Sequence, residues 1–134
     1  LEHLSGLKKL KDVTFMRVTG VSDEGIQHLA GLPLKKLDLR GTSVTGAGFE
    51  ALQDAPITDI DLSETPANDK GMEALSALEG LESLDLWNSL VTDAGLEHLA
   101  KLKKLKFLRL QGTNVTKEGV ENLRKSLPDT EIKA

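Results

Sequence analysis

The chain has no cysteine and no tyrosine among its 134 residues, and aromatic residues make up only 3% of it. Without cysteine, disulfide frameworks and cysteine-based metal sites are excluded. With so few aromatic residues, a hydrophobic core has to be built from aliphatic side chains, chiefly leucine. No apolar run approaches the roughly 20 residues that cross a bilayer, so we expect no membrane insertion.

The chain also lacks an excess of positive charge, since its net charge at pH 7 is −4. A nucleic-acid partner requires clustered basic side chains to neutralise the phosphate backbone, and we therefore expect no such partner. The length is that of one domain, and we expect residues 1–134 to form a single domain.

Repetition is the main feature that the sequence does show. The segment that begins at Leu81 returns at Leu105, a shift of 24 residues (105 − 81). The same shift joins Leu84 to Leu108, Leu86 to Leu110, Val91 to Val115, Gly95 to Gly119 and Leu99 to Leu123. A glycine marks each unit at positions 25, 48, 71, 95 and 119, which gives about five units. A fixed period in the twenties is the signature of a solenoid.

Each unit is predicted to contain a short strand followed by a helix. Leu84-x-Leu86 and its equivalents alternate apolar and polar residues, as half-buried strands do. Leu96, Leu99 and Leu102 share one helical face. We expect the helices to begin after residues that cap free backbone N–H groups well, namely Ser22, Thr45, Asn68, Thr92 and Thr116.

The first residues are already repeat material, because residues 1–11 nearly copy residues 96–106. We therefore expect the chain to start inside a helix, with an apolar end formed by Leu1, Leu4 and Leu7. Two explanations are open: truncation inside a repeat, or cover by further repeats or another domain. End-on self-association would use the same end. In the first unit we expect a bulge or loop insertion between Phe15 and Val21.

The unit LxxLxLxxTxVTxxGxxxLxxL, seen in Leu34, Leu37, Leu39, Thr42 and Val44, resembles the leucine-rich repeat. The segment at residues 92–96 looks like bacterial repeats related to the cysteine-containing and ribonuclease-inhibitor-like types. The resemblance implies an α/β fold, a right-handed solenoid shaped as a partial horseshoe, with parallel strands on the concave face and helices on the convex face. It also implies ligand or protein binding on the concave face, and rarely catalysis.

The familiar repeat has Asn or Cys where this chain has a small hydroxyl residue. A hydroxyl there can still bond the backbone of the turn after each strand. The positions are Thr19, Thr42, Thr65, Ser89 and Thr113.

The alternation predicts which strand residues point outward, and we call the surface that they form the concave face. It has three columns. The first contains Asp12, Lys36, Asp59, Ser83 and Phe107. The second contains Thr14, Asp38, Asp61, Asp85 and Arg109. The third contains Met16, Arg40, Ser63, Trp87 and Gln111.

Two features of these columns are candidates for binding. Trp87, the only tryptophan, is either an exposed anchor of the kind enriched at protein interfaces or packs flat against a loop residue such as Leu90. The acids of the second column either attract a basic peptide, a basic surface or a cation, or are simply tolerated. Arg40 and Arg109 flank these acids and could equally be their ion-pair partners.

No motif for catalysis or phosphate binding is present. His3, His28 and His98 lack metal-ligand spacing, so we expect no metal site, no cofactor and no enzymatic activity. We expect a noncatalytic recognition scaffold for a protein or peptide. The alternative is a structural spacer or regulatory segment of a larger protein. The predicted contacts are Arg40, Asp61, Asp85, Trp87, Phe107 and Arg109.

Overall fold

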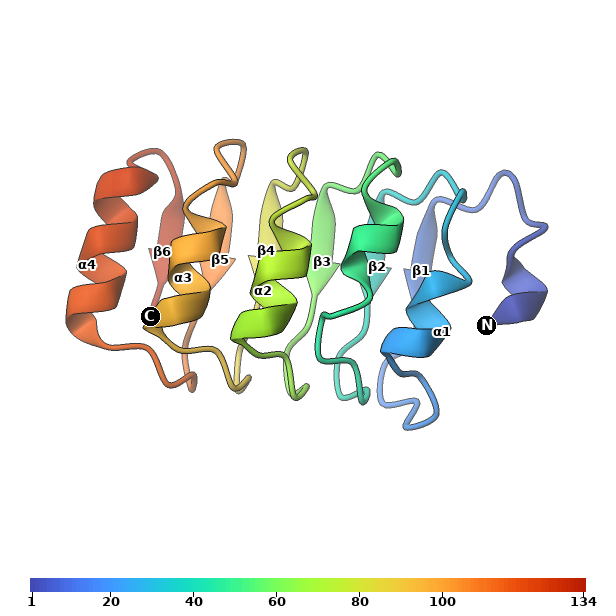
Figure 1. Ribbon diagram of the computed structural model, residues 1–134, viewed down its shortest axis with the longest axis horizontal. Helices are drawn as coiled ribbons and strands as arrows, with labels where there is room; N and C mark the ends of the chain where they lie inside the picture. Colours follow the sequence, from blue (N-terminus) through green and yellow to red (C-terminus); the bar gives the residue numbers. More distant parts are fainter.

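A computed structural model describes all residues, 1–134. Six three-residue strands form one parallel sheet in the order in which they occur along the chain (Figure 1). Each strand pairs with the next, so the units stack in a row. The strands are β1 (Asp12–Thr14), β2 (Lys36–Asp38), β3 (Asp59–Asp61), β4 (Ser83–Asp85), β5 (Phe107–Arg109) and β6 (Glu131–Lys133).

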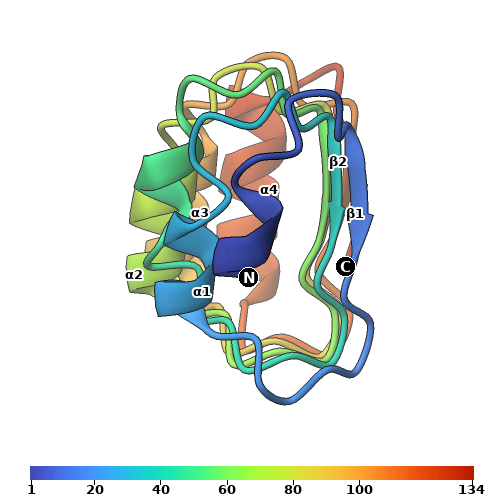
Figure 2. The same cartoon turned by 90° about the vertical axis from the view of Figure 1, so that its right-hand side faces the viewer.

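The helical segments lie on the other side of the stack, and Figure 2 shows the two layers along the solenoid axis. This arrangement confirms the predicted α/β solenoid. None of its helices has the length and apolar character needed to cross a membrane. The segments are η1 (Glu2–Leu4), α1 (Asp23–Gln27), η2 (Phe49–Leu52), α2 (Asp69–Leu75), α3 (Asp93–Leu99) and α4 (Lys117–Ser126), of which η1 and η2 are short 3₁₀ turns.

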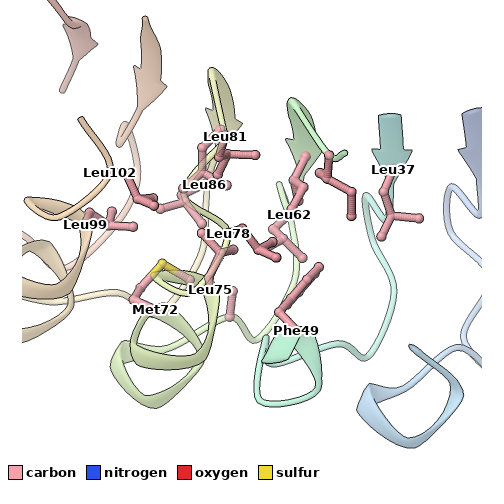
Figure 3. Packing of buried hydrophobic residues seen from close by; sticks show 14 of the residues in the cluster. Leu37, Phe49, Leu62, Met72, Leu75, Leu78, Leu81, Leu86, Leu99 and Leu102 are labelled. Carbon is pink, nitrogen blue, oxygen red and sulfur yellow. The ribbon is translucent and has the colours of Figure 1, made fainter. Parts of the chain in front are cut away.

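The core is one aliphatic cluster that runs the length of the stack, between the sheet and the helices (Figure 3). Leu37, Ile60, Leu84 and Leu108 lie side by side in the sheet register, and all are buried. Burying a side chain of this kind stabilises the fold by roughly 1.5–3 kcal/mol. Because each unit contributes several, the stack can be held together with almost no aromatic residues.

Four of the five predicted helix starts are confirmed, since α1, α2, α3 and α4 follow Ser22, Asn68, Thr92 and Thr116. The side chains of Asn68, Thr92 and Thr116 accept a backbone N–H as caps, whereas that of Ser22 makes no such bond. The prediction for Thr45 is wrong. In that unit the helical segment is the 3₁₀ turn η2, and its N-cap is Gly48. Gly46 follows Thr45 with a φ of +98°, a left-handed conformation that directs the chain away from a helix.

Three inter-unit contacts, which we call Asp–Thr latches, join the helical halves of neighbouring units. In each, the first residue of a helix accepts hydrogen bonds from the backbone amide and the hydroxyl of a threonine in the next unit. The bonds lie between 2.5 and 3.1 Å. The pairs are Asp23 with Thr45, Asp69 with Thr92, and Asp93 with Thr116. The carboxylates that the sequence assigns to helix starts therefore also connect the units.

The turn hydroxyls behave as expected at three of the five positions. Thr42, Thr65 and Thr113 each donate to the carbonyl oxygen three residues earlier. Ser89 is buried and its hydroxyl has no partner. Thr19 is exposed, because the extra residue of the first unit lies in the loop and Val18 takes its turn position. The Val18 amide donates to the Phe15 carbonyl oxygen, just as the Thr42 amide donates to the Leu39 carbonyl oxygen.

The N-terminal end differs from the expected helix, since Glu2–Leu4 forms only a 3₁₀ turn. Leu1 and Leu4 are half-buried and pack against the core, whereas Leu7 is 48% exposed. Leu7 is therefore the main exposed residue of the predicted apolar end.

Candidate functional site

The register of the sheet confirms the three columns of the concave face. Asp38, Asp61 and Asp85 stand side by side on β2, β3 and β4, followed by Arg109 on β5. Lys36, Asp59, Ser83 and Phe107 form the first column in the same way. Backbone hydrogen bonds just beyond the strands, such as that from the Glu64 amide to the Trp87 carbonyl oxygen, fix the third column.

The acids of the second column have a local structural role. Oδ1 of Asp38 accepts the backbone N–H of Arg40, and Oδ1 of Asp85 accepts that of Trp87. Asp61 does the same for Ser63 at 2.9 Å and also accepts the Ser63 hydroxyl. These bonds hold each carboxylate in one orientation, so one oxygen of each acid supports the end of its own strand.

Arg40 and Asp61 form the shortest ion pair of the concave face, at 2.7 Å between Nη2 and Oδ2. Burial alone would raise the pKa of Asp61, but hydrogen bonds from the Ser63 hydroxyl, Arg40 and the Ser63 amide outweigh it and lower that pKa. The same bond to Asp61 raises the pKa of Arg40, and the nearby charge of Asp61 adds to the effect. Both groups are therefore charged and paired at neutral pH.

Arg109 is held at three points. Its Nη1 lies 3.3 Å from Oδ2 of Asp85, and its Nε donates to the Gln111 side chain at 3.0 Å. The guanidinium also lies over the Trp87 ring, 5.1 Å from the centroid, a distance typical of a cation–π contact. The structure thus brings Asp85, Trp87 and Arg109 together into one cluster.

Phe107 is covered in a similar way, because the Lys133 ammonium lies 5.4 Å from its ring centroid. Both outward aromatic residues are half-buried, and each has a cation from the following strand over its ring. Sequence reasoning missed both contacts, although the predicted columns held a signal for the first, because Arg109 is one strand and one column away from Trp87. The structure adds Lys133 to the second column beside Arg109, beyond the predicted columns. Leu90, proposed as a neighbour of Trp87, is 55% exposed.

A shallow hollow of about 270 Å³ lies on the concave face over the middle strands. Asp61, Asp85 and Phe107 line it, whereas Arg40, Trp87 and Arg109 lie outside its lining. The polar and aromatic residues around it are Lys36, Asp38, Asp59, Asp61, Ser83, Asp85 and Phe107. Sequence reasoning placed Lys36 and Asp59 in the first column but did not select them as contacts. Of the six predicted residues, three therefore line the hollow, Trp87 and Arg109 form the neighbouring cluster with Asp85, and Arg40 is joined to the hollow by its ion pair with Asp61.

Larger hollows lie away from this face, two of them beside α4. One, of about 400 Å³, lies between α3 and α4, and another, of about 450 Å³, lies beside α4 and the end of the sheet. Nowhere do three His, Asp or Glu side chains gather in an arrangement that could hold a metal ion. The concave face offers charge, hydrogen-bonding groups and aromatic surface, which are means of recognition.

Comparisons with known proteins agree with the repeat and the fold. A family model described as leucine-rich repeat matches residues 101–123, and a search of the curated proteins found no match. A leucine-rich-repeat protein of Leptospira interrogans has a similar structure, with a TM-score of 0.74 and 24% identity over 100% of this chain and 33% of that chain. An internalin C2 of Listeria monocytogenes has a TM-score of 0.72 and 25% identity over 92% of this chain and 50% of that chain.

The chain thus spans a third of the length of the first protein and half of the second. Both similar structures are bacterial proteins, and the likeness in fold extends over nearly all of this chain. Residues 101–123 match the leucine-rich-repeat family model, and the fold of the whole stack is that of a leucine-rich-repeat solenoid.

Proposed function

We propose that this chain is a noncatalytic recognition scaffold that binds a protein or peptide through its concave face. The observation that carries the proposal is the fixed array of charged and aromatic side chains there. Asp61 and Asp85 are oriented by backbone amides, and their arginine partners are held by ion pairs. A surface ordered before binding loses less conformational entropy when a partner docks.

The proposed contacts are of two kinds. Trp87 and Arg109 form a preassembled aromatic and cationic cluster, and these residue types are enriched among the residues that dominate binding energy. Asp61 and Asp85 line the hollow beside Phe107. Arg40 completes the set through its ion pair with Asp61.

The finer kinship to ribonuclease-inhibitor-like repeats also remains a proposal, supported by the helices opposite the sheet.

The test is a binding measurement with a partner isolated from the native source. Trp87→Ala and Arg109→Ala should each weaken binding at least about tenfold, the range of a binding hot spot. His98→Ala on the helical side is the matched control and should leave the affinity unchanged. Equal affinity for the wild type and both concave-face variants would refute the assignment of the concave face.

The alternative proposal is a structural spacer or regulatory segment of a larger protein. It is supported by the coverage of the similar structures, because this chain corresponds to only a third or half of their length. The two proposals differ in one readout. If the chain is a spacer, its contribution to the activity of the larger protein survives when Trp87 and Arg109 are both replaced by Ala. If the chain is a recognition scaffold, the double replacement removes that contribution.

End-on self-association is a further proposal for the N-terminal end. It is supported by the 48% exposure of Leu7 beside the partly buried Leu1 and Leu4. Sedimentation velocity over a range of concentrations tests it, and Leu7→Glu should then shift the distribution toward the monomer. A wild-type chain that stays monomeric at the highest concentration would dismiss it.

A further inference from the structure

The junctions between units are not alike on the helical side. We number the units by their residues: unit 1 is 10–33, unit 2 is 34–56, unit 3 is 57–80, unit 4 is 81–104 and unit 5 is 105–128. Asp–Thr latches join unit 1 to unit 2, unit 3 to unit 4, and unit 4 to unit 5. No latch joins unit 2 to unit 3, because Gly46 stands where units 1, 3 and 4 have aspartate.

A second link is missing at the same junction. Elsewhere a turn residue donates its amide to the carbonyl oxygen of the preceding unit, as Ser43 does to Val21 at 3.1 Å and Leu90 to Ala67 at 2.8 Å. The residue in that place in unit 3 is Pro66, which has no N–H to donate. The remaining backbone bond in this region runs from the Asn68 amide to the Thr45 carbonyl oxygen, at 3.3 Å.

At the start of their helical segments, units 2 and 3 instead meet through bare backbone, above the shared core that contains Phe49 and Met72. A Cβ built on Gly71 would lie 2.0 Å from the Thr45 carbonyl oxygen and 3.0 Å from the Gly46 Cα. Close contact of this kind contributes dispersion but no directional bond. The segment that faces it in unit 2 is the short 3₁₀ turn η2 rather than an α-helix.

The sheet side of this junction is held firmly. β2 and β3 pair in full register, and the Arg40–Asp61 ion pair crosses the junction at 2.7 Å. A second pair, Arg17–Glu64 at 3.7 Å, reaches from unit 1 to unit 3 across Gly41. The junction is therefore bonded along the concave face and unlatched on the helical face.

We propose that the junction between units 2 and 3 is a hinge that divides the solenoid into two cooperative blocks, residues 1–56 and 57–134. In a repeat array each unit contacts only its neighbours, so cooperativity is transmitted by the interfaces between them. The interface with the fewest side-chain bonds is the one at which local opening separates the array. The helical sides part first, and the strands and ion pairs of the concave face act as the pivot.

The hinge lies under the hollow of the concave face. Lys36 and Asp38 of the hollow belong to the first block, whereas Asp59, Asp61 and Asp85 belong to the second. A change of angle at the junction therefore changes the shape of the hollow. The hinge is argued from the contacts between units alone, and it stands whether or not the concave face binds a partner.

Native-state hydrogen exchange, followed by mass spectrometry on the full chain at increasing denaturant, tests the proposal. We expect a step in the amide exchange rate between residues 56 and 57, with amides of the first block exchanging at least about tenfold faster than those of the second. High salt should widen the step, because it screens the ion pairs at the pivot. Exchange of the whole chain as one unit, or a smooth gradient from the N-terminus without a step, would overturn the hinge.

A matched pair of variants ties the step to this junction. Pro66→Asn supplies the missing N–H with the residue found at the equivalent position 114, and it should shrink the step. Leu90→Pro removes the equivalent bond between units 3 and 4, and it should create a new step at residues 80 and 81. The emission of Trp87 reports whether each variant is folded. If both variants fold and neither moves the step, the proposal is wrong.

Discussion

Units 2 and 4 of this solenoid are alike on the sheet side and different on the helical side. Their strands pair in the same parallel sheet, and Leu39 and Leu86 are both fully buried at equivalent positions. Yet α3 of unit 4 has seven residues with a threonine cap, whereas η2 of unit 2 has four residues and no side-chain cap. The strand half of a unit is thus the constant part, and the helical half varies.

The difference between units 2 and 4 shows which half of the repeat can change its structure. The strand half is fixed by pairing on both sides and by two inward side chains. The helical half depends on a few residues at its start, and Gly46 in place of Asp93 is enough to change it. In unit 2 the fully buried ring of Phe49 fills the position that Leu96 occupies in unit 4. A larger side chain thus accompanies a shorter helical segment.

The largest effect should come from the constant part. Leu86→Ala and Leu39→Ala should each lower the free energy of unfolding by about 2–5 kcal/mol, because each leaves a cavity under the sheet. Chemical denaturation followed by circular dichroism measures both. Similar losses would support the equivalence of the two strand halves, and a much smaller loss for Leu39→Ala would show that units 2 and 4 differ there as well.

The next effect concerns the close approach of units 2 and 3. Gly71→Ala should lower the free energy of unfolding by about 1–3 kcal/mol, since the new methyl group meets the Thr45 carbonyl oxygen. Gly20→Ala is the control, because nothing lies within 4 Å of a Cβ there, and it should change stability by less than about 0.5 kcal/mol. Equal stability of the two variants would mean that the backbones of units 2 and 3 can separate freely.

A loss in the same range should follow removal of one Asp–Thr latch. Asp69→Ala removes the acceptor of the Thr92 amide and hydroxyl, and one of the two acceptors of the Gly95 amide, and should lower the free energy of unfolding by about 1–3 kcal/mol. Asp54→Ala on the exposed surface of unit 2 is the control and should be neutral. Thermal unfolding of both variants gives the comparison. If Asp69→Ala is also neutral, the latches do not distinguish the junctions.

The smallest effect should depend on pH and should disappear in acid. The pKa of Asp61 is lowered in the folded chain, so its contribution to stability is complete above the unfolded value of about 3.9 and is lost as the pH falls through the folded pKa. Asp61→Asn should therefore be less stable than the wild type at pH 6 and approach it below pH 3. Unfolding midpoints across this range measure the difference, with Asp129→Asn as an exposed control. A difference that does not change with pH would contradict the role of the Asp61 charge.

Much of the candidate site could be predicted from the sequence, because strand register follows from the repeat. Alternation of Leu84 and Leu86 with polar residues placed Asp85 and Trp87 outward, and the structure agrees. The contacts of these outward side chains could not be predicted. The position of Arg109 over Trp87 depends on side-chain rotamers and on bonds to Asp85 in its own column and to Gln111 in the third column.

The helical side was predicted less well, and for a different reason. The residue type at Thr45 suits a helix cap, but the conformation of the following Gly46 cannot be read from its identity. Glycine accepts both left-handed and right-handed conformations at similar energy, so its surroundings select one. The same applies at the start of the chain, where a segment nearly identical to residues 96–106 forms a 3₁₀ turn.

The sequence by itself determined the stack. An apolar residue, most often leucine, at every second strand position and a unit of 23 or 24 residues leave each unit with an apolar side that only its neighbour can cover. The tertiary structure alone decided how tightly each pair of units is joined and which outward side chains pair with one another. These outcomes depend on distances of about 3 Å between residues some 20 positions apart, and such distances exist only after the chain has folded.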